Sequence, residues 1–193
     1  MKHFPRLLFF AAIILLLLSI ASFAQRRDFV SEEEGELIRE HQEIDMRIDV
    51  LTKFIDRRLA AAGIAGSTWT PPKRNVEVWG PEPKGTRLEL LSDIRRLLQK
   101  SIDDIDDIAS RTSTATEGNE VTGKLFPKAV RSLSAAAARY RPIFQVELAK
   151  SPPEAERGLL MQSIEFCDQI IEAAANLPAE TPKDQGKKKK DGN

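Results

Sequence analysis

The chain has 193 residues with 29 basic and 29 acidic side chains, so its formal net charge at pH 7 is zero. Its composition, with 41% apolar residues and a single cysteine, excludes collagen-like and disulfide-rich proteins. The balanced charge also argues against a strongly nucleic-acid-binding protein, so we expect no nucleic-acid partner.

The first predicted element is an export signal over residues 1–24. The basic residues Lys2 and Arg6 precede an apolar run over 7–18. Ser22 and Ala24 are small residues at positions −3 and −1 relative to a cleavage site before Gln25. These are the parts of a secretory signal peptide. An uncleaved membrane anchor is the alternative, because the apolar stretch just reaches the length of a membrane span. The sequence therefore predicts an exported protein, either periplasmic or secreted, or held by that anchor.

Three later segments begin with the capping-box pattern, in which Ser or Thr is followed three residues later by Glu. The patterns start at Ser31, Thr86 and Ser151. The hydroxyl and the carboxylate of such a pair satisfy backbone N–H groups that the first helical turn leaves unpaired. Each pattern therefore predicts the start of a helix, and Pro152 suits the first turn of the third one.

Apolar residues recur at steps of three and four, which places each set on one face of a helix. After a short helix over Ser31–His41, four stripes follow: Ile44, Ile48, Leu51, Ile55, Leu59, Ala62; Leu88, Leu91, Ile94, Leu98, Ile102, Ile105, Ile108; Val130, Leu133, Ala137, Tyr140, Phe144, Leu148; and Leu160, Ile164, Cys167, Ile171, Ala174. No stretch shows sustained strand alternation. We expect an all-α fold over residues 25–177, a bundle of four long amphipathic helices plus a short N-terminal helix.

Three details of these helices depend on a few residues. Nothing between His41 and Asp45 forbids continuity, so the first two helices are either separate or one bent helix. Gly63 is expected to end the second helix, as glycine commonly does. Pro142 is expected to interrupt the backbone hydrogen bonding of the helix that carries the stripe Val130–Leu148, and to kink that helix there.

Two loops and a tail break the helical pattern. The segment Gly63–Gly85 is about 23 residues long and contains Trp69, Trp79 and four prolines, so we interpret it as a functional loop or a long crossover. A polar segment over Thr112–Gly123 is expected to be a second loop. Residues 178–193 lack large apolar side chains and are expected to form a disordered, lysine-rich tail.

Few side chains of this chain suit catalysis. The histidines are His3 and His41, and Cys167 is the one cysteine. This leaves little material for a catalytic triad, a zinc site or a haem site, so we expect a non-enzymatic protein without metal or other cofactor. We interpret His41 as a solvated helix-end residue and Cys167 as a buried, inert thiol.

Three groups of residues are candidates for binding. Trp69 and Trp79 suit a partner-facing surface, and the alternative is that their indoles cover the end of the bundle. Asp103, Asp106 and Asp107 carry oxygen ligands of the kind that Ca²⁺ takes, and the alternative is a solvated helix face. The run Lys187, Lys188, Lys189 and Lys190 suits weak, salt-sensitive contact with an anionic surface, and a solubilising tail is the alternative.

One resemblance supports the helical prediction. The run Glu36-Leu37-Ile38-Arg39-Glu40, followed by Gln42, Glu43, Asp45, Arg47 and Ile48, resembles the opening of uncharacterised exported helical proteins of bacteria. The helix start Ser151-Pro152-Pro153-Glu154 resembles the same group. The resemblance implies a helical fold and export, and it implies no chemical activity.

The leading hypothesis is an exported, non-enzymatic helical protein of the cell envelope that binds a protein partner or itself. The alternative is a small-ligand or divalent-cation-binding helical bundle that uses the aspartates.

Overall fold

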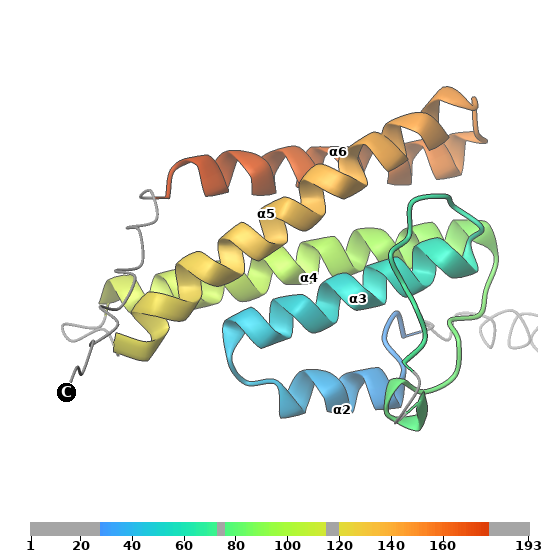
Figure 1. Ribbon diagram of the computed structural model, residues 1–193. Helices are drawn as coiled ribbons and strands as arrows, with labels where there is room; N and C mark the ends of the chain where they lie inside the picture. The colour runs from blue at the N-terminus through green and yellow to red at the C-terminus, as the bar shows by residue number, and fades with distance from the viewer. Residues whose placement is uncertain (1–27, 73–75, 115–119, 178–193) are drawn as a thin grey trace, which may run out of the picture.

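The computed structural model describes residues 28–72, 76–114 and 120–177 (Figure 1). The predicted signal peptide over residues 1–24 and the lysine tail over 178–193 lie outside the described residues. Within them the elements are α2 (Glu32–Glu40), α3 (Ile44–Ala61), the short 3-10 helix η1 (Val76–Trp79), α4 (Arg87–Thr114), α5 (Glu120–Ala149) and α6 (Glu154–Ala175). The described part of the chain contains no strand, and the expected all-α class is confirmed. None of its helices is both long and apolar enough to span a membrane.

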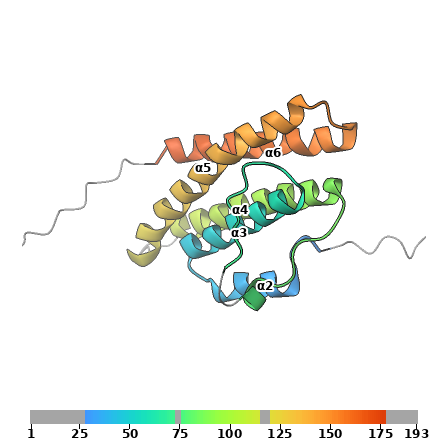
Figure 2. The same ribbon diagram turned by 45° about the vertical axis from the view of Figure 1, so that its right-hand side comes forward.

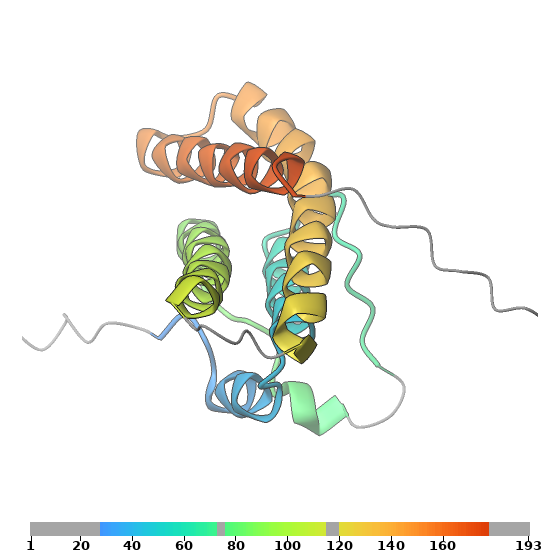
Figure 3. The same cartoon turned by 90° about the vertical axis from the view of Figure 1, so that its left-hand side faces the viewer.

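The helices lie in layers on either side of α3 and α4. α3 packs against both α4 and α5, and α6 packs along α5 and against α4. α2 contacts α3 and η1, on the side of α3 away from α6 (Figure 3). In Figure 2 α6 lies at the top of the molecule, α5 extends from there down past α4 and α3, and α2 lies at the bottom.

The predicted apolar stripes form the core. Ile48, Leu51, Ile55 and Leu59 of α3 are fully buried, and most members of the α4 and α5 stripes are buried. In the α6 stripe Leu160 and Cys167 are buried, and the other three members are half-buried. The prediction that Leu88 of α4 belongs to the core is wrong, because its side chain is 40% exposed. Leu88 lies in the first turn of α4, and Leu90 and Leu97 take core positions that the stripe did not include.

The helix boundaries answer the questions that the sequence left open, and they differ from the prediction at the loop expected over Thr112–Gly123. α2 and α3 are separate helices, because His41 leaves the helical conformation with φ −95° and ψ 79°. Gly63 has φ +66° directly after α3, in agreement with its expected role. α5 continues through Pro142, and the kink expected there stays a prediction. The predicted bounds of the loop Thr112–Gly123 are wrong at both ends, because α4 extends to Thr114 and α5 begins at Glu120. Once a helix has formed, adding further residues to it is favourable even where they are polar.

The capping boxes are confirmed in two of three cases. Ser31 Oγ accepts the Glu34 N–H at 3.2 Å while the Glu34 carboxylate accepts the Ser31 N–H at 3.1 Å. Thr86 and Glu89 make the same pair of bonds. The predicted box at Ser151 is wrong, because α6 is capped by Pro153 without a side-chain bond and the Ser151 N–H instead donates to Leu148 O, at the end of α5.

Candidate functional site

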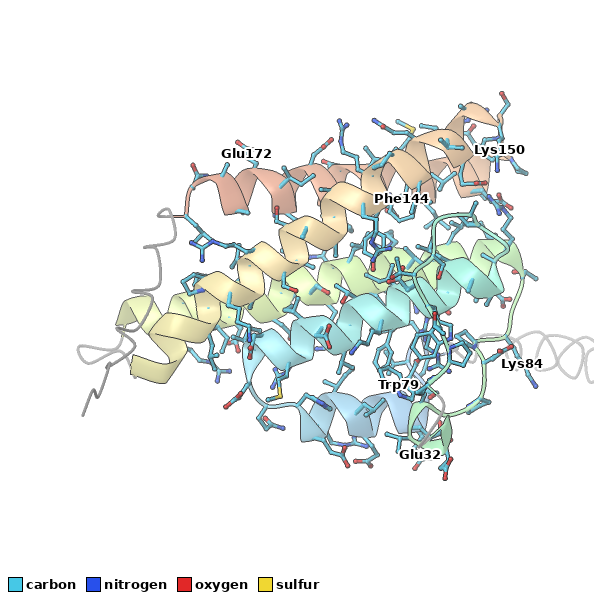
Figure 4. All side chains as sticks on the ribbon, viewed as in Figure 1. Glu32, Trp79, Lys84, Phe144, Lys150 and Glu172 are labelled. Carbon is cyan, nitrogen blue, oxygen red and sulfur yellow. The ribbon has the colours of Figure 1, made fainter. Side chains whose placement is uncertain are left out.

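The two tryptophans of the loop Gly63–Gly85 lie side by side over α3. Trp69 and Trp79 have ring centroids 5.1 Å apart in an edge-on arrangement, and Trp79 packs edge-on against Phe54 of α3 at 6.0 Å. Both indoles are half-buried. Figure 4 shows Trp79 between α3 and the start of α2, where Glu32 lies. The loop therefore folds back along the helix.

A buried ion-pair cluster lies beneath the tryptophans. Arg58 Nη1 and Nη2 donate to the two carboxylate oxygens of Glu34 at 2.8 and 2.6 Å, and Arg57 Nη1 donates to Glu34 Oε1 at 2.6 Å. At most 4% of any of these three side chains is exposed. We call Glu34, Arg57 and Arg58 the arginine clamp.

The clamp joins segments that are far apart in the sequence. Arg57 Nη2 donates to the carbonyl of Pro81 at 2.8 Å, and Arg58 Nη2 donates to the carbonyl of Phe29 at 2.6 Å. The same carboxylate of Glu34 closes the capping box of α2. The clamp therefore ties the start of α2, the C-terminal half of α3 and the end of the Trp/Pro loop to one another.

Gly80 allows the loop to approach α2 closely. Its φ of +64° lies in the left-handed region, and a Cβ built there would lie 2.8 Å from Glu33 Oε2. Both the backbone conformation and the space therefore favour glycine. This turn brings the Pro81 carbonyl to Arg57.

The charges of the clamp are nearly balanced. Asp93 of α4 lies with its carboxylate 3.9 Å from Arg58 Nε, so two buried acids face two buried arginines. Burial lowers the pKa of the Arg57 guanidinium, neighbouring Arg58 acts in the same direction, and Glu34 opposes both. Because the acids compensate the cations, the arrangement suits a structural support better than an anion-binding site.

Two cationic side chains and two cavities lie next to the tryptophans and the arginine clamp. Arg57 lies over the ring of Trp69 at 5.3 Å, and Lys53 lies over the ring of Trp79 at 5.8 Å. Two cavities of about 230 and 130 Å³ flank the clamp and share Glu82 and Pro83 in their walls.

A second ion pair holds the beginning of the loop. Arg139 of α5 donates to both carboxylate oxygens of Asp56 at 2.8 Å, and Thr68 Oγ1 donates to the same carboxylate at 2.8 Å. Asp56 is 4% exposed. The loop is therefore fixed at both ends by buried charges of α3.

Sequence reasoning identified the tryptophans as candidates but missed the clamp and Asp56. The one signal for them was the run Asp56-Arg57-Arg58, which lies between the predicted core positions Ile55 and Leu59. Such a run is indistinguishable from a solvated helix face until its partners are known.

The structure does not bring the aspartates of α4 together with the tryptophans. Asp103 accepts a hydrogen bond from Gln99, and Asp107 pairs with Arg111 one turn away. Asp106 lies at the wall of a small apolar cavity between α4, α5 and α6. Across the described residues, no group of three or more His, Cys, Asp or Glu is arranged to hold a metal ion. Cation binding by these aspartates stays a prediction.

The lone histidine and cysteine of the described chain lie at a helix end and in the core, respectively. His41 caps the end of α2, with Nδ1 2.7 Å from the carbonyl oxygen of Leu37, and it is half-buried rather than fully solvated. Cys167 is fully buried, and burial raises the pKa of its thiol to about 12.

Comparison of the chain with protein-family models, with curated proteins and with solved structures finds no match in any of the three.

Proposed function

We propose that this chain is an exported, non-enzymatic helical protein of the cell envelope that binds a protein partner through the Trp/Pro loop Gly63–Gly85. In this proposal the four long helices form a bundle that serves as the scaffold. The observation that carries the proposal is the arginine clamp, which holds a tryptophan-bearing loop in one arrangement through buried ion pairs.

A loop that is ordered before it binds loses less conformational entropy on binding, and this favours affinity. Tryptophan and arginine are also the residues most enriched at the energetic centres of protein interfaces. Both indoles retain exposed surface next to a cation, so the loop offers amphipathic contacts at low entropic cost.

The two tryptophans differ in a way that sharpens the test. Trp79 packs against Phe54 and belongs to the edge of the hydrophobic core, whereas Trp69 lies outside that cluster. We therefore expect Trp79→Ala to lower the melting temperature clearly. Trp69→Ala is expected to leave the melting temperature nearly unchanged and to abolish the binding of the protein that co-purifies with the chain from envelope extract.

Truncation of the chain at Gln185 serves as the control, because it removes the four consecutive lysines and leaves the loop intact. Loss of the partner on truncation, with Trp69→Ala binding normally, would contradict the loop proposal. N-terminal sequencing of the purified envelope protein tests export separately: a start at Gln25 supports cleavage, and retention of residue 1 supports the anchored form.

A further inference from the structure

A shallow groove runs along the outer surface of α5 and α6, far from the arginine clamp. Its volume is about 710 Å³, and Leu148, Met161 and Ile164 supply apolar wall while Glu165 and Asp168 supply charge. Met161 in its wall is 56% exposed, and Val146 of α5 is 58% exposed. No basic side chain of the described residues lines this groove.

Acidic residues continue from the groove toward the end of α6. Glu165, Asp168 and Glu172 follow at steps of three and four, so they lie on one helix face. Figure 4 shows Glu172 on the outer side of α6. Asp168 pairs with Arg141 of α5. No ion pair joins Glu165 or Glu172 to another of the described residues, and both are exposed.

We propose that Lys187–Lys190, in the segment 178–193 that follows α6, bind over this groove. The segment carries five lysines against three acids, so its charge complements that of the acidic face. The aliphatic part of a lysine side chain can cover apolar surface while its ammonium group stays at the polar edge. Lysine therefore suits a groove whose wall contains both apolar and acidic side chains.

The length of the chain suits this contact. The rise of an α-helix places Asp168 about 10 Å and Met161 about 21 Å back from Ala175. The four lysines lie ten to thirteen positions after Leu177. Ten residues of extended chain span at most about 33–36 Å, so this length of chain is enough to reach both Asp168 and Met161. Because the ligand is tethered, a contact too weak to form between separate molecules is populated.

Position also favours α6 over α2, while on α4 Asp104 and Asp107 already pair with Lys100 and Arg111. α2 carries exposed Glu32, Glu36 and Glu40, but it contacts only α3 and η1 and lies on the opposite side of the molecule from α6 (Figure 3). The acidic face of α6 instead ends where the lysine segment begins.

A spin label on the full chain tests the proposal. The variant Gly192→Cys receives the label next to the lysines, while native Cys167 is buried and its raised pKa keeps it unreactive. We expect NMR signals of Met161–Glu172 to broaden in the labelled protein, and signals of α2 to stay sharp. The broadening should fade at high salt, since the screening length falls from about 10 Å at 0.1 M to about 3 Å at 1 M.

Matched double variants separate charge recognition from chance contact. E165Q/E172Q is expected to abolish the broadening, whereas E32Q/E40Q, which removes two exposed carboxylates from α2, leaves it unchanged. A well-dispersed NMR spectrum shows that each variant is folded. The proposal is overturned if E165Q/E172Q has no effect, or if α2 broadens as much as α6. It is also overturned if the broadening arises only between molecules in a mixture of labelled and isotope-enriched chains, which would indicate a second copy in the groove.

Discussion

Glu34 serves two neighbouring structures at once. Its carboxylate closes the capping box with Ser31 and accepts hydrogen bonds from Arg57 and Arg58. Buried ion pairs of this kind contribute little net stability relative to apolar packing, because removing charges from water is costly. What the pairs do is fix one arrangement of α2, α3 and the loop, since any other leaves buried cations without partners.

The Glu34 carboxylate is the shared partner of two buried arginines. We expect Glu34→Ala to lower the free energy of unfolding by about 3–5 kcal/mol, because both arginines lose their buried partner. Urea unfolding of the variant and the parent measures this difference. Glu36→Ala on the same helix is the control, since Glu36 pairs with Arg39 at the exposed surface and its loss should leave stability essentially unchanged. Equal stability of the two variants would show that the clamp is not a structural support.

The junction between α5 and α6 shows how one residue decides between two elements. Ser151 has a positive φ of 54°, and its N–H bonds back to Leu148 O in the last turn of α5. It therefore occupies the position after a helix end where glycine is most common. The Ser-Pro-Pro-Glu pattern predicted the start of α6 within a few residues, but the serine belongs to the end of α5.

Because a left-handed conformation costs a non-glycine residue roughly 1–2 kcal/mol, we expect Ser151→Gly to raise the stability of the protein by about 1 kcal/mol. Ser31→Ala should do the opposite and lower it by about 1 kcal/mol, since Ser31 is a genuine N-cap. Thermal unfolding of both variants provides the comparison. A loss of stability in Ser151→Gly would indicate that its hydroxyl caps α6 after all.

Two leucines of α4 test the assignment of its buried face. Leu98 is fully buried and Leu88 is 40% exposed, although both belong to the same predicted stripe. We expect Leu98→Ala to cost about 2–5 kcal/mol through the cavity that it leaves. Leu88→Ala should change stability by less than about 0.5 kcal/mol. Similar losses in the two variants, measured by urea unfolding, would mean that the face is wrongly assigned.

For the whole molecule, the sequence predicted the helices well and their arrangement only in part. Helical periodicity is a local property, so stripes such as Ile48–Leu59 could be read directly. The second buried face of α3 could not, because Arg57 becomes a core residue only through Glu34, 23 positions earlier, and Pro81, 24 positions later. The same holds for Asp56, whose partner Arg139 lies 83 residues away.

The carboxylates of Glu147 and Asp45 form ion pairs between different helices, and they make the free energy of unfolding depend on pH. Burial alone would raise the pKa of Glu147, but hydrogen bonds from Lys150 and Arg87 outweigh it and the pKa lies below its ordinary value. A hydrogen bond from Lys128 lowers the pKa of Asp45. A pKa that is lower in the folded than in the unfolded chain gives stability that is present above the unfolded value and lost as pH falls through the folded one.

We therefore expect the free energy of unfolding to be level near pH 6 and to fall below the ordinary glutamate pKa of 4.5. Glu147→Gln should flatten this fall, because the glutamine has no proton to gain, although the variant is less stable at neutral pH through the weakened contact with Arg87. Leu98→Ala is the control: it should lower stability by the same amount at every pH, since it removes no titrating group. Urea midpoints measured at pH 7, 5, 4 and 3 distinguish the two variants. A Glu147→Gln curve that runs parallel to the parent would show that this carboxylate, despite linking the start of α4 to the end of α5, does not contribute to the acid sensitivity.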